Sequence, residues 1–177
     1  DLTEQTAMIA CQGPNVMDII SNFSREVPSL KNYSFCEKNL MILKMTISRT
    51  GYTGEDGVEV IMGAKMAPMA IKLLLKDGSD HADSMKPAGL GARDSLRLEA
   101  GMPLYGHELD EQTDPLSAGL NFAVNLDKSE EADGPTIPKF IGQDALIKIA
   151  VDGPSRKLIG LKLSGKRTPR QGADVRL

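Results

Sequence analysis

Residues 41–62 read MILKMTISRTGYTGEDGVEVIM, and this stretch decides the fold of the 177-residue chain. Apolar and polar side chains largely alternate over residues 41–48, and a period of two is typical of a half-buried strand. Three glycines within residues 51–57 cannot all lie in regular structure, so they predict a shaped loop. Alternation resumes after the loop and predicts a second strand, which carries Glu59 on the face opposite its two valine neighbours.

Helical and further strand patterns surround this pair of strands. Four helices are predicted from apolar residues at helical spacing: one that begins at Pro14 and closes before Pro28, one over 66–74 that ends at 77–78, one over 87–100, and one over 142–150. Alternation predicts strands at 120–126 and 157–163, and Lys38-Asn39 is expected to turn an earlier strand into the one at 41–48. The fold class that follows is α+β, with helices packed on a mixed or antiparallel sheet.

Composition and charge narrow the classes of function. No apolar run approaches the roughly 18 residues of a membrane span, and no basic and apolar leader opens the chain, so we expect no membrane partner. The absence of Trp, with three Tyr and four Phe, leaves few rings for stacking on nucleic-acid bases. Residues 156–177 are basic, but their charges are spaced along strand and turn patterns without aromatic residues between them, so we also expect no nucleic-acid partner.

Cysteine and histidine patterns indicate neither a disulfide framework nor a metal site. Cys11 and Cys36 form no Cys-x-x-Cys pair, and we expect them to be small buried residues in a reducing compartment. The two histidines have no second ligand at metal-binding spacing. Residues 128–139 are polar and contain Pro and Gly, which makes them the best candidate for a linker or an insertion.

Carboxylates and arginines on this glycine-shaped scaffold are the candidate functional groups. Glu55 and Asp56 lie in the predicted loop, Glu59 lies on the strand, and Arg93 and Arg97 lie four apart on one side of a predicted helix. A carboxylate accepts two parallel donors from an amino-pyrimidinone edge, and a guanidinium binds carboxylates in the mirror geometry. These residues can therefore surround a planar, amide-like heterocycle with acidic appendages.

A structural explanation of the same residues stays open at this point. Asp94 lies three residues before Arg97, and the two can form an ion pair on the helix surface. Glu55 can be a solvated loop charge. The residue types alone do not decide between this explanation and a ligand site.

Two long blocks resemble a known family. The run from Ile47 to Val60 resembles the signature of the aminomethyltransferases, the T-protein of the glycine cleavage system. Residues 87–101, PAGLGARDSLRLEAG, are similar to that family's helix and the start of its following loop. Shorter matches follow in the family's order at residues 10–14, 104–106, 108–111, 114–115, 140–142 and 156–161. The resemblance therefore covers nearly the whole chain.

The resemblance implies a fold and a reaction. The fold is the folate-binding α+β type, followed by a C-terminal β-barrel domain. In the reaction, an aminomethyl group on the lipoyl arm of the partner H-protein loses ammonia, and its one-carbon unit passes to tetrahydrofolate to give methylenetetrahydrofolate. The implied partners are lipoylated H-protein and folate, and the implied location is the cytoplasm of a bacterium or the mitochondrial matrix of a eukaryote.

The resemblance also implies site residues. Glu59 matches the acidic position that contacts the pterin, and Arg93 matches the arginine counted with the folate site. Tyr52 and Glu55 belong to the same signature and have weaker claims. We assign Arg97, with its acidic neighbour three residues earlier, to holding the helix in place.

The chain departs from the family's pattern in two respects. The family's catalytic carboxylate lies in a segment with a Gly-Gly pair before an Asp-Asp pair, and no Gly-Gly pair occurs here. We therefore expect the catalytic Asp upstream of this sequence and no catalytic residue within it. The expected domains are a folate-binding region over 1–150 and the beginning of a truncated β domain over 151–177, in a fragment that is inactive or nearly so alone.

Two other functions remain open from the sequence. One is the C-terminal domain of a folate-dependent demethylase or oxidase, which has the same scaffold. The other is a non-catalytic, folate-binding protein related to tRNA modification.

Overall fold

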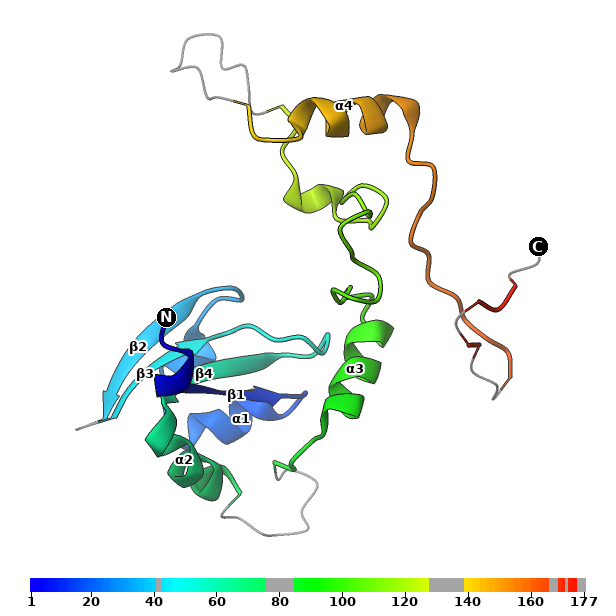
Figure 1. The fold of residues 1–177 in the computed structure, drawn as a ribbon. Coiled ribbons are helices and arrows are strands. Elements are labelled where there is room, and N and C mark those ends of the chain that lie inside the picture. Colours follow the sequence, from blue (N-terminus) through cyan, green and yellow to red (C-terminus); the bar gives the residue numbers. More distant parts are fainter. Residues whose placement is uncertain (41–42, 76–84, 128–138, 166–168, 171, 175–177) are drawn as a thin grey trace. The chain divides into compact units, whose positions relative to one another are not determined.

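The computed structural model describes residues 1–40, 43–75, 85–127, 139–165, 169–170 and 172–174. These residues form two compact units, Asp1–Met102 and Pro103–Leu177, which are described separately below (Figure 1). The predicted helix end at 77–78, the first two residues of the strand predicted at 41–48 and all but the last residue of the predicted linker at 128–139 lie outside the described residues. The expected domain boundary near residue 150 remains a prediction.

The first unit is built on a four-stranded antiparallel sheet. Its strands are β1 (Thr6–Gln12), β2 (Phe35–Leu40), β3 (Leu43–Ser48) and β4 (Gly57–Gly63), in the order β1-β4-β3-β2. The predicted pair of strands around the glycine-rich loop is thus β3 and β4, and the α+β class is confirmed. The turn expected at Lys38-Asn39 is wrong, because both residues continue the β2 ladder and pair with Met45 and Lys44 of β3.

Helices cover one face of this sheet. They are α1 (Val16–Ser21) and α2 (Ala67–Leu74) (Figure 1). The unit also contains the short 3-10 turns η1 (Thr3–Gln5), η2 (Val27–Ser29) and η3 (Ala64–Met66). The core of buried residues combines strand side chains with those of α1 and η2: Cys11, Ile47 and Val58 with Val16, Ile20 and Val27. Burying an aliphatic side chain of this size contributes about 1.5 to 3 kcal/mol, so this face supplies much of the unit's stability.

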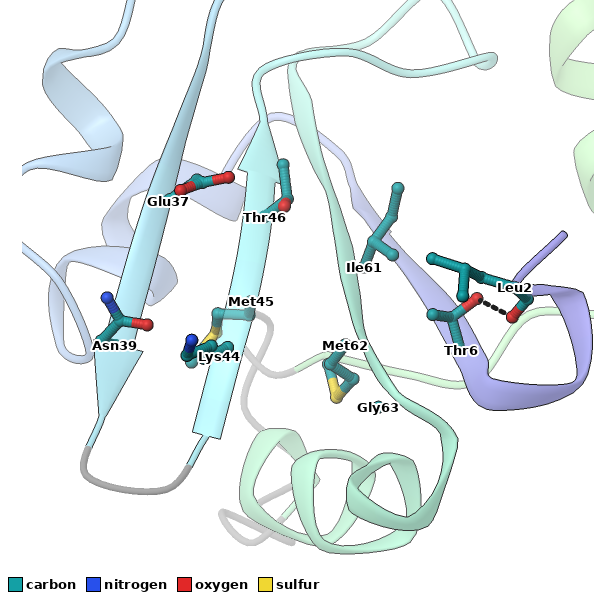
Figure 2. Close-up of a pocket in the computed structure, with 10 residues that line it drawn as sticks. All are labelled: Leu2, Thr6, Glu37, Asn39, Lys44, Met45, Thr46, Ile61, Met62 and Gly63. Carbon is teal, nitrogen blue, oxygen red and sulfur yellow. Dashed lines mark hydrogen bonds between the residues drawn. The ribbon is translucent and has the colours of Figure 1, made fainter.

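The opposite face of the sheet is open. Met8, Phe35 and Ile61 are 55%, 66% and 42% exposed, and they alternate along their strands with the core residues. Figure 2 shows Glu37, Thr46 and Ile61 on this face, where a groove of about 420 Å³ runs toward Leu2 and Thr6. Glu59 lies two residues before Ile61 in β4 and therefore belongs to the same open face.

Helix α3 (Leu90–Glu99) completes the first unit and confirms the helix predicted over 87–100. Gly89 is its N-cap residue, and Gly101, with φ +72°, follows its C-terminal end as predicted. Among the described residues, none of the helices combines the length and apolar character that crossing a bilayer requires.

The second unit contains α4 (Gln143–Asp152), which confirms the predicted fourth helix, and the 3-10 turn η4 (Asn121–Ala123). The strand predicted at 120–126 is wrong, because the backbone N–H groups of Ala123 and Val124 bond to carbonyls three residues earlier. Gln143 is 1% exposed and holds this segment from α4 by donating to the Leu126 carbonyl at 2.9 Å.

Residues 157–163 do not form the expected strand, which is predicted above as the first strand of a β domain. A strand needs a neighbour to receive its backbone hydrogen bonds. In this segment the Leu158 N–H donates to the Ser117 carbonyl at 3.0 Å, and no ladder follows within the described residues.

Candidate functional site

An arginine fork closes the base of the glycine loop, which we define as residues 49–57 between β3 and β4. Arg49 donates from Nε to Asp56 Oδ1 at 3.1 Å and from Nη2 to Asp56 Oδ2 at 2.6 Å. Its Nη1 donates to the Pro28 and Leu30 carbonyls at 3.1 and 2.6 Å. This bidentate geometry ties both ends of the loop together, and the two Nη1 bonds fix them to η2 and to Leu30, the residue that follows it.

The same fork sets the protonation of the pair. The hydrogen bonds from Arg49 lower the pKa of Asp56, aided by the Gly57 backbone N–H at 2.9 Å, although burial acts in the opposite direction. The pKa of Arg49 is raised, chiefly by the hydrogen bond to Asp56. Asp56, which the sequence offered as a possible ligand group, is therefore engaged in holding the loop.

Gln12 fills the interior of the glycine loop. Its Nε2 donates to the Thr50 carbonyl at 3.1 Å, and its Oε1 accepts from Thr53 Oγ1 at 3.1 Å. A Cβ at Gly51 or Gly57 would lie 1.8 Å from Gln12 Oε1 or 2.2 Å from Gln12 Nε2, so both positions require glycine while this side chain is in place. In the sequence, Gln12 lies in the short family match at residues 10–14, and no local pattern indicates this role.

Glu59 is held through one carboxylate oxygen. Thr50 Oγ1 donates to Glu59 Oε2 at 2.5 Å, and Ser48 Oγ lies 2.8 Å from Thr50 Oγ1. No hydrogen bond or ion pair to Glu59 Oε1 occurs within the described part of the chain. The carboxylate is half-buried on the open sheet face and presents its second oxygen as an acceptor.

The two arginines of α3 have different environments. Arg97 is 2% exposed, donates from Nε and Nη2 to Asp94 Oδ1 at 2.8 and 2.6 Å, and donates from Nη1 to the Met102 carbonyl at 3.3 Å. The predicted pair with Asp94 is therefore present. Arg93 is half-buried, its guanidinium carbon lies 5.1 Å from the centre of the Tyr52 ring, and no hydrogen bond or ion pair engages it within the residues described.

The structure brings Tyr52 and Arg93 together and leaves the other predicted site residues separate. Glu55 is exposed, and its backbone N–H donates to Thr53 Oγ1 at 3.3 Å, while its carboxylate has no hydrogen bond or ion pair to any described residue. No hydrogen bond or ion pair joins Glu59 to Arg93. Neither Glu59 nor Arg93 lines the groove shown in Figure 2. Within the described ranges, no group of three His, Cys, Asp or Glu side chains is arranged to hold a metal ion.

Comparison with known protein families shows to which family the chain belongs. Residues 1–128 match the family model of the GCVT N-terminal domain, and the chain belongs to this family. The match covers β1 to β4, the glycine loop and α3, and therefore all four predicted site residues.

Relatives agree with this assignment. The chain is 43% identical over 176 residues to an aminomethyltransferase of Rubrobacter xylanophilus and 43% identical over 175 residues to one of Halothermothrix orenii. These matches cover 99% and 98% of this chain but 44% and 46% of the relatives, so the chain spans less than half the length of the curated relatives it matches.

A solved structure is also similar. The crystal structure of glycine cleavage system aminomethyltransferase T from Bartonella henselae matches with a TM-score of 0.69 and 31% sequence identity. The match covers 86% of this chain and 38% of that one.

The close approach of the glycine loop to α3 predicts the effect of a substitution at Gly54. Its φ is +77°, and an added Cβ would lie 2.7 Å from Ala100 Cβ. Gly54→Ala should lower the free energy of unfolding by about 1 to 2 kcal/mol or more, because a left-handed backbone and a steric clash act together. Urea unfolding measures this change.

Gly63→Ala is the matched control for this measurement. Gly63 has φ −58°, and an added Cβ there meets no atom within 4 Å. Equal stabilities of the two variants would contradict the packing of the loop tip against α3.

The Arg49–Asp56 fork predicts a change in acid stability. Because the pKa of Asp56 is lowered in the folded state, its stabilisation is present at neutral pH and disappears as the pH falls below about 4. Asp56→Asn should therefore unfold at lower urea than the wild type at pH 7, and the difference should shrink toward pH 3. Glu55→Gln, in the same loop but exposed, is the control and should follow the wild type at both pH values. A difference that stays constant with pH for Asp56→Asn would refute this role.

Proposed function

We propose that this chain supplies part of the tetrahydrofolate site of a glycine cleavage aminomethyltransferase. The proposed reaction releases ammonia from the aminomethyl-lipoyl group of an H-protein and passes the one-carbon unit to tetrahydrofolate. The aminomethyltransferase relatives favour this function over the folate-dependent oxidase and over the non-catalytic protein related to tRNA modification. These relatives come from bacteria, in keeping with a cytoplasmic enzyme.

The observation that carries the proposal is the contrast between partnered and unpartnered charges in one unit. Arg49, Asp56 and Arg97 are engaged in ion pairs that hold the fold together. Glu59 Oε1 and the Arg93 guanidinium have no such partner among the residues that the structure describes. Half-buried charges without a protein partner are costly unless solvent or a ligand compensates them, and both lie in the two blocks that carry the family resemblance.

Each proposed binding residue has a distinct task. The Glu59 carboxylate is acceptor-only and suits the adjacent amino and ring N–H donors of a pterin. Arg93 offers a planar fork for a carboxylate of the folate, and its guanidinium carbon lies 5.1 Å from the centre of the Tyr52 ring. Glu55, exposed at the loop tip, is proposed only for the rim of the site.

We propose that proton transfer in the reaction depends on a residue that is not among the 177 residues of this sequence. The family's catalytic carboxylate has no counterpart in this sequence, and general acid–base catalysis typically contributes about 10²- to 10⁴-fold. This chain then binds and orients the acceptor, and alone it has little or no transferase activity.

Glu59→Gln tests the proposal directly. The amide offers one acceptor where two are needed, so the dissociation constant for tetrahydrofolate should rise by roughly 10- to 100-fold. Anaerobic calorimetric titration of the complete gene product measures it. Glu37→Gln, on the same sheet face in β2, is the control and should bind as the wild type does. Unchanged affinity in Glu59→Gln would remove the assignment of this site.

Arg93→Lys tests the second anchor. Lysine keeps the charge but lacks the planar fork, so tetrahydrofolate should bind roughly 3- to 10-fold more weakly. Arg25→Lys is the control, because Arg25 is exposed and lies outside the proposed site. Equal affinities of the two lysine variants and the wild type would show that the contact is not a guanidinium fork.

A further inference from the structure

Two hydroxyl groups connect the end of β3 to the Glu59 carboxylate. We propose that these side chains, Ser48 and Thr50, form a hydroxyl chain that fixes the orientation of Glu59, and that Thr50 is a positioning residue of the ligand site. This inference rests on the proposed function, because it assigns a role to the residues behind the proposed pterin acceptor. Both residues lie in the signature run from Ile47 to Val60, but the resemblance assigned neither of them a role.

The direction of each hydrogen bond in the hydroxyl chain follows from which of its groups can donate a proton. An ionised carboxylate can only accept, so the single Thr50 hydroxyl proton is donated to Glu59 Oε2 at 2.5 Å. Thr50 Oγ1 then has lone pairs left, and the Ser48 hydroxyl, at 2.8 Å, donates to it. The alternative acceptor for Ser48, the Glu59 backbone carbonyl, is farther away at 3.3 Å. The order of donation is therefore Ser48 to Thr50 to Glu59.

The register of the sheet and the Gln12 side chain hold the residues of the hydroxyl chain and Glu59 in place. Ser48 and Glu59 are direct cross-strand partners of β3 and β4, so their side chains stand side by side on the open face. Thr50 lies two residues beyond Ser48, and its carbonyl accepts from Gln12 Nε2 at 3.1 Å. Ser48, Thr50 and Glu59 are all half-buried, which limits competition from water.

This arrangement leaves a defined set of acceptors for a ligand. Thr50 uses one lone pair of Glu59 Oε2, while Oε1 has no partner among the described residues. The remaining lone pairs of the two oxygens are then available to two parallel donors. Without the Thr50 hydroxyl the carboxylate can rotate about its terminal torsion, which is broad and weakly restrained, and ordering it on binding then costs affinity.

The test compares three threonine variants of the complete gene product. Thr50→Val keeps the shape and the β-branch but removes the hydroxyl, and it should weaken tetrahydrofolate binding by roughly 3- to 10-fold. Thr50→Ser restores the hydroxyl and should bind within about twofold of the wild type. Thr46→Val, on the same face of β3 and outside the hydroxyl chain, is the matched control and should not change the affinity.

A double-mutant cycle separates positioning from a general effect on structure. If Thr50 acts through Glu59, then Thr50→Val should cause no further loss of affinity in a Glu59→Gln background. An equal loss in both backgrounds would overturn the inference. Should Thr50→Val fail to fold, Ser48→Ala removes the other donor and should weaken binding in the same direction, again only when Glu59 is present.

The binding results that would overturn this inference differ from those that would overturn the proposed function. Weak binding by Glu59→Gln together with wild-type binding by Thr50→Val would overturn the hydroxyl chain and leave the proposed function standing. Wild-type binding by Glu59→Gln would overturn the proposed function and this inference with it. Weak binding by both single variants, with no added effect in the double variant, is the expected result.

Discussion

The Gln12 side chain is the constraint on which the candidate site depends. It occupies the space that side chains at positions 51 and 57 would need, and it holds the Thr50 carbonyl and the Thr53 hydroxyl from inside the loop. A loop with this many glycines has high conformational entropy when unfolded, so an ordered shape requires compensating contacts. Gln12 supplies polar contacts within the loop, and the Arg49 fork supplies the closure at its base.

Two neighbouring arginines of α3 differ in how far the protein itself engages them. Arg97 and Arg93 lie one helical turn apart on α3, yet Arg97 is buried against Asp94 while Arg93 rests on the Tyr52 ring with its donors unused within the described region. A buried and fully paired guanidinium cannot be offered to a ligand without leaving an uncompensated charge behind. The helix therefore holds its position through Arg97, and Arg93 remains the arginine proposed for ligand binding.

The sequence predicted local structure better than structure that depends on distant partners. The strands around the loop and the helix with its Asp94–Arg97 pair follow from periodicity and short spacing, and all are present. The contacts of Gln12 with the loop span 38 and 41 residues, and no local pattern encodes them. The strand predictions at 120–126 and 157–163 are wrong for a related reason. Alternation indicates that a segment would have one apolar and one polar face as a strand, but a strand also requires a neighbouring strand with which to form a hydrogen-bond ladder.

Glu59 lies on the sheet face that the helices of the first unit leave uncovered, and this position limits what the chain can do by itself. Small-molecule sites typically bury about 70 to 90% of the ligand surface, whereas one sheet face offers a single wall. Near Glu59 that wall includes Ile61, which is 42% exposed, and the hydroxyl chain beneath the carboxylate. Such a wall gives a ligand direction through fixed acceptors but little enclosure, so tight binding requires further surfaces opposite this face.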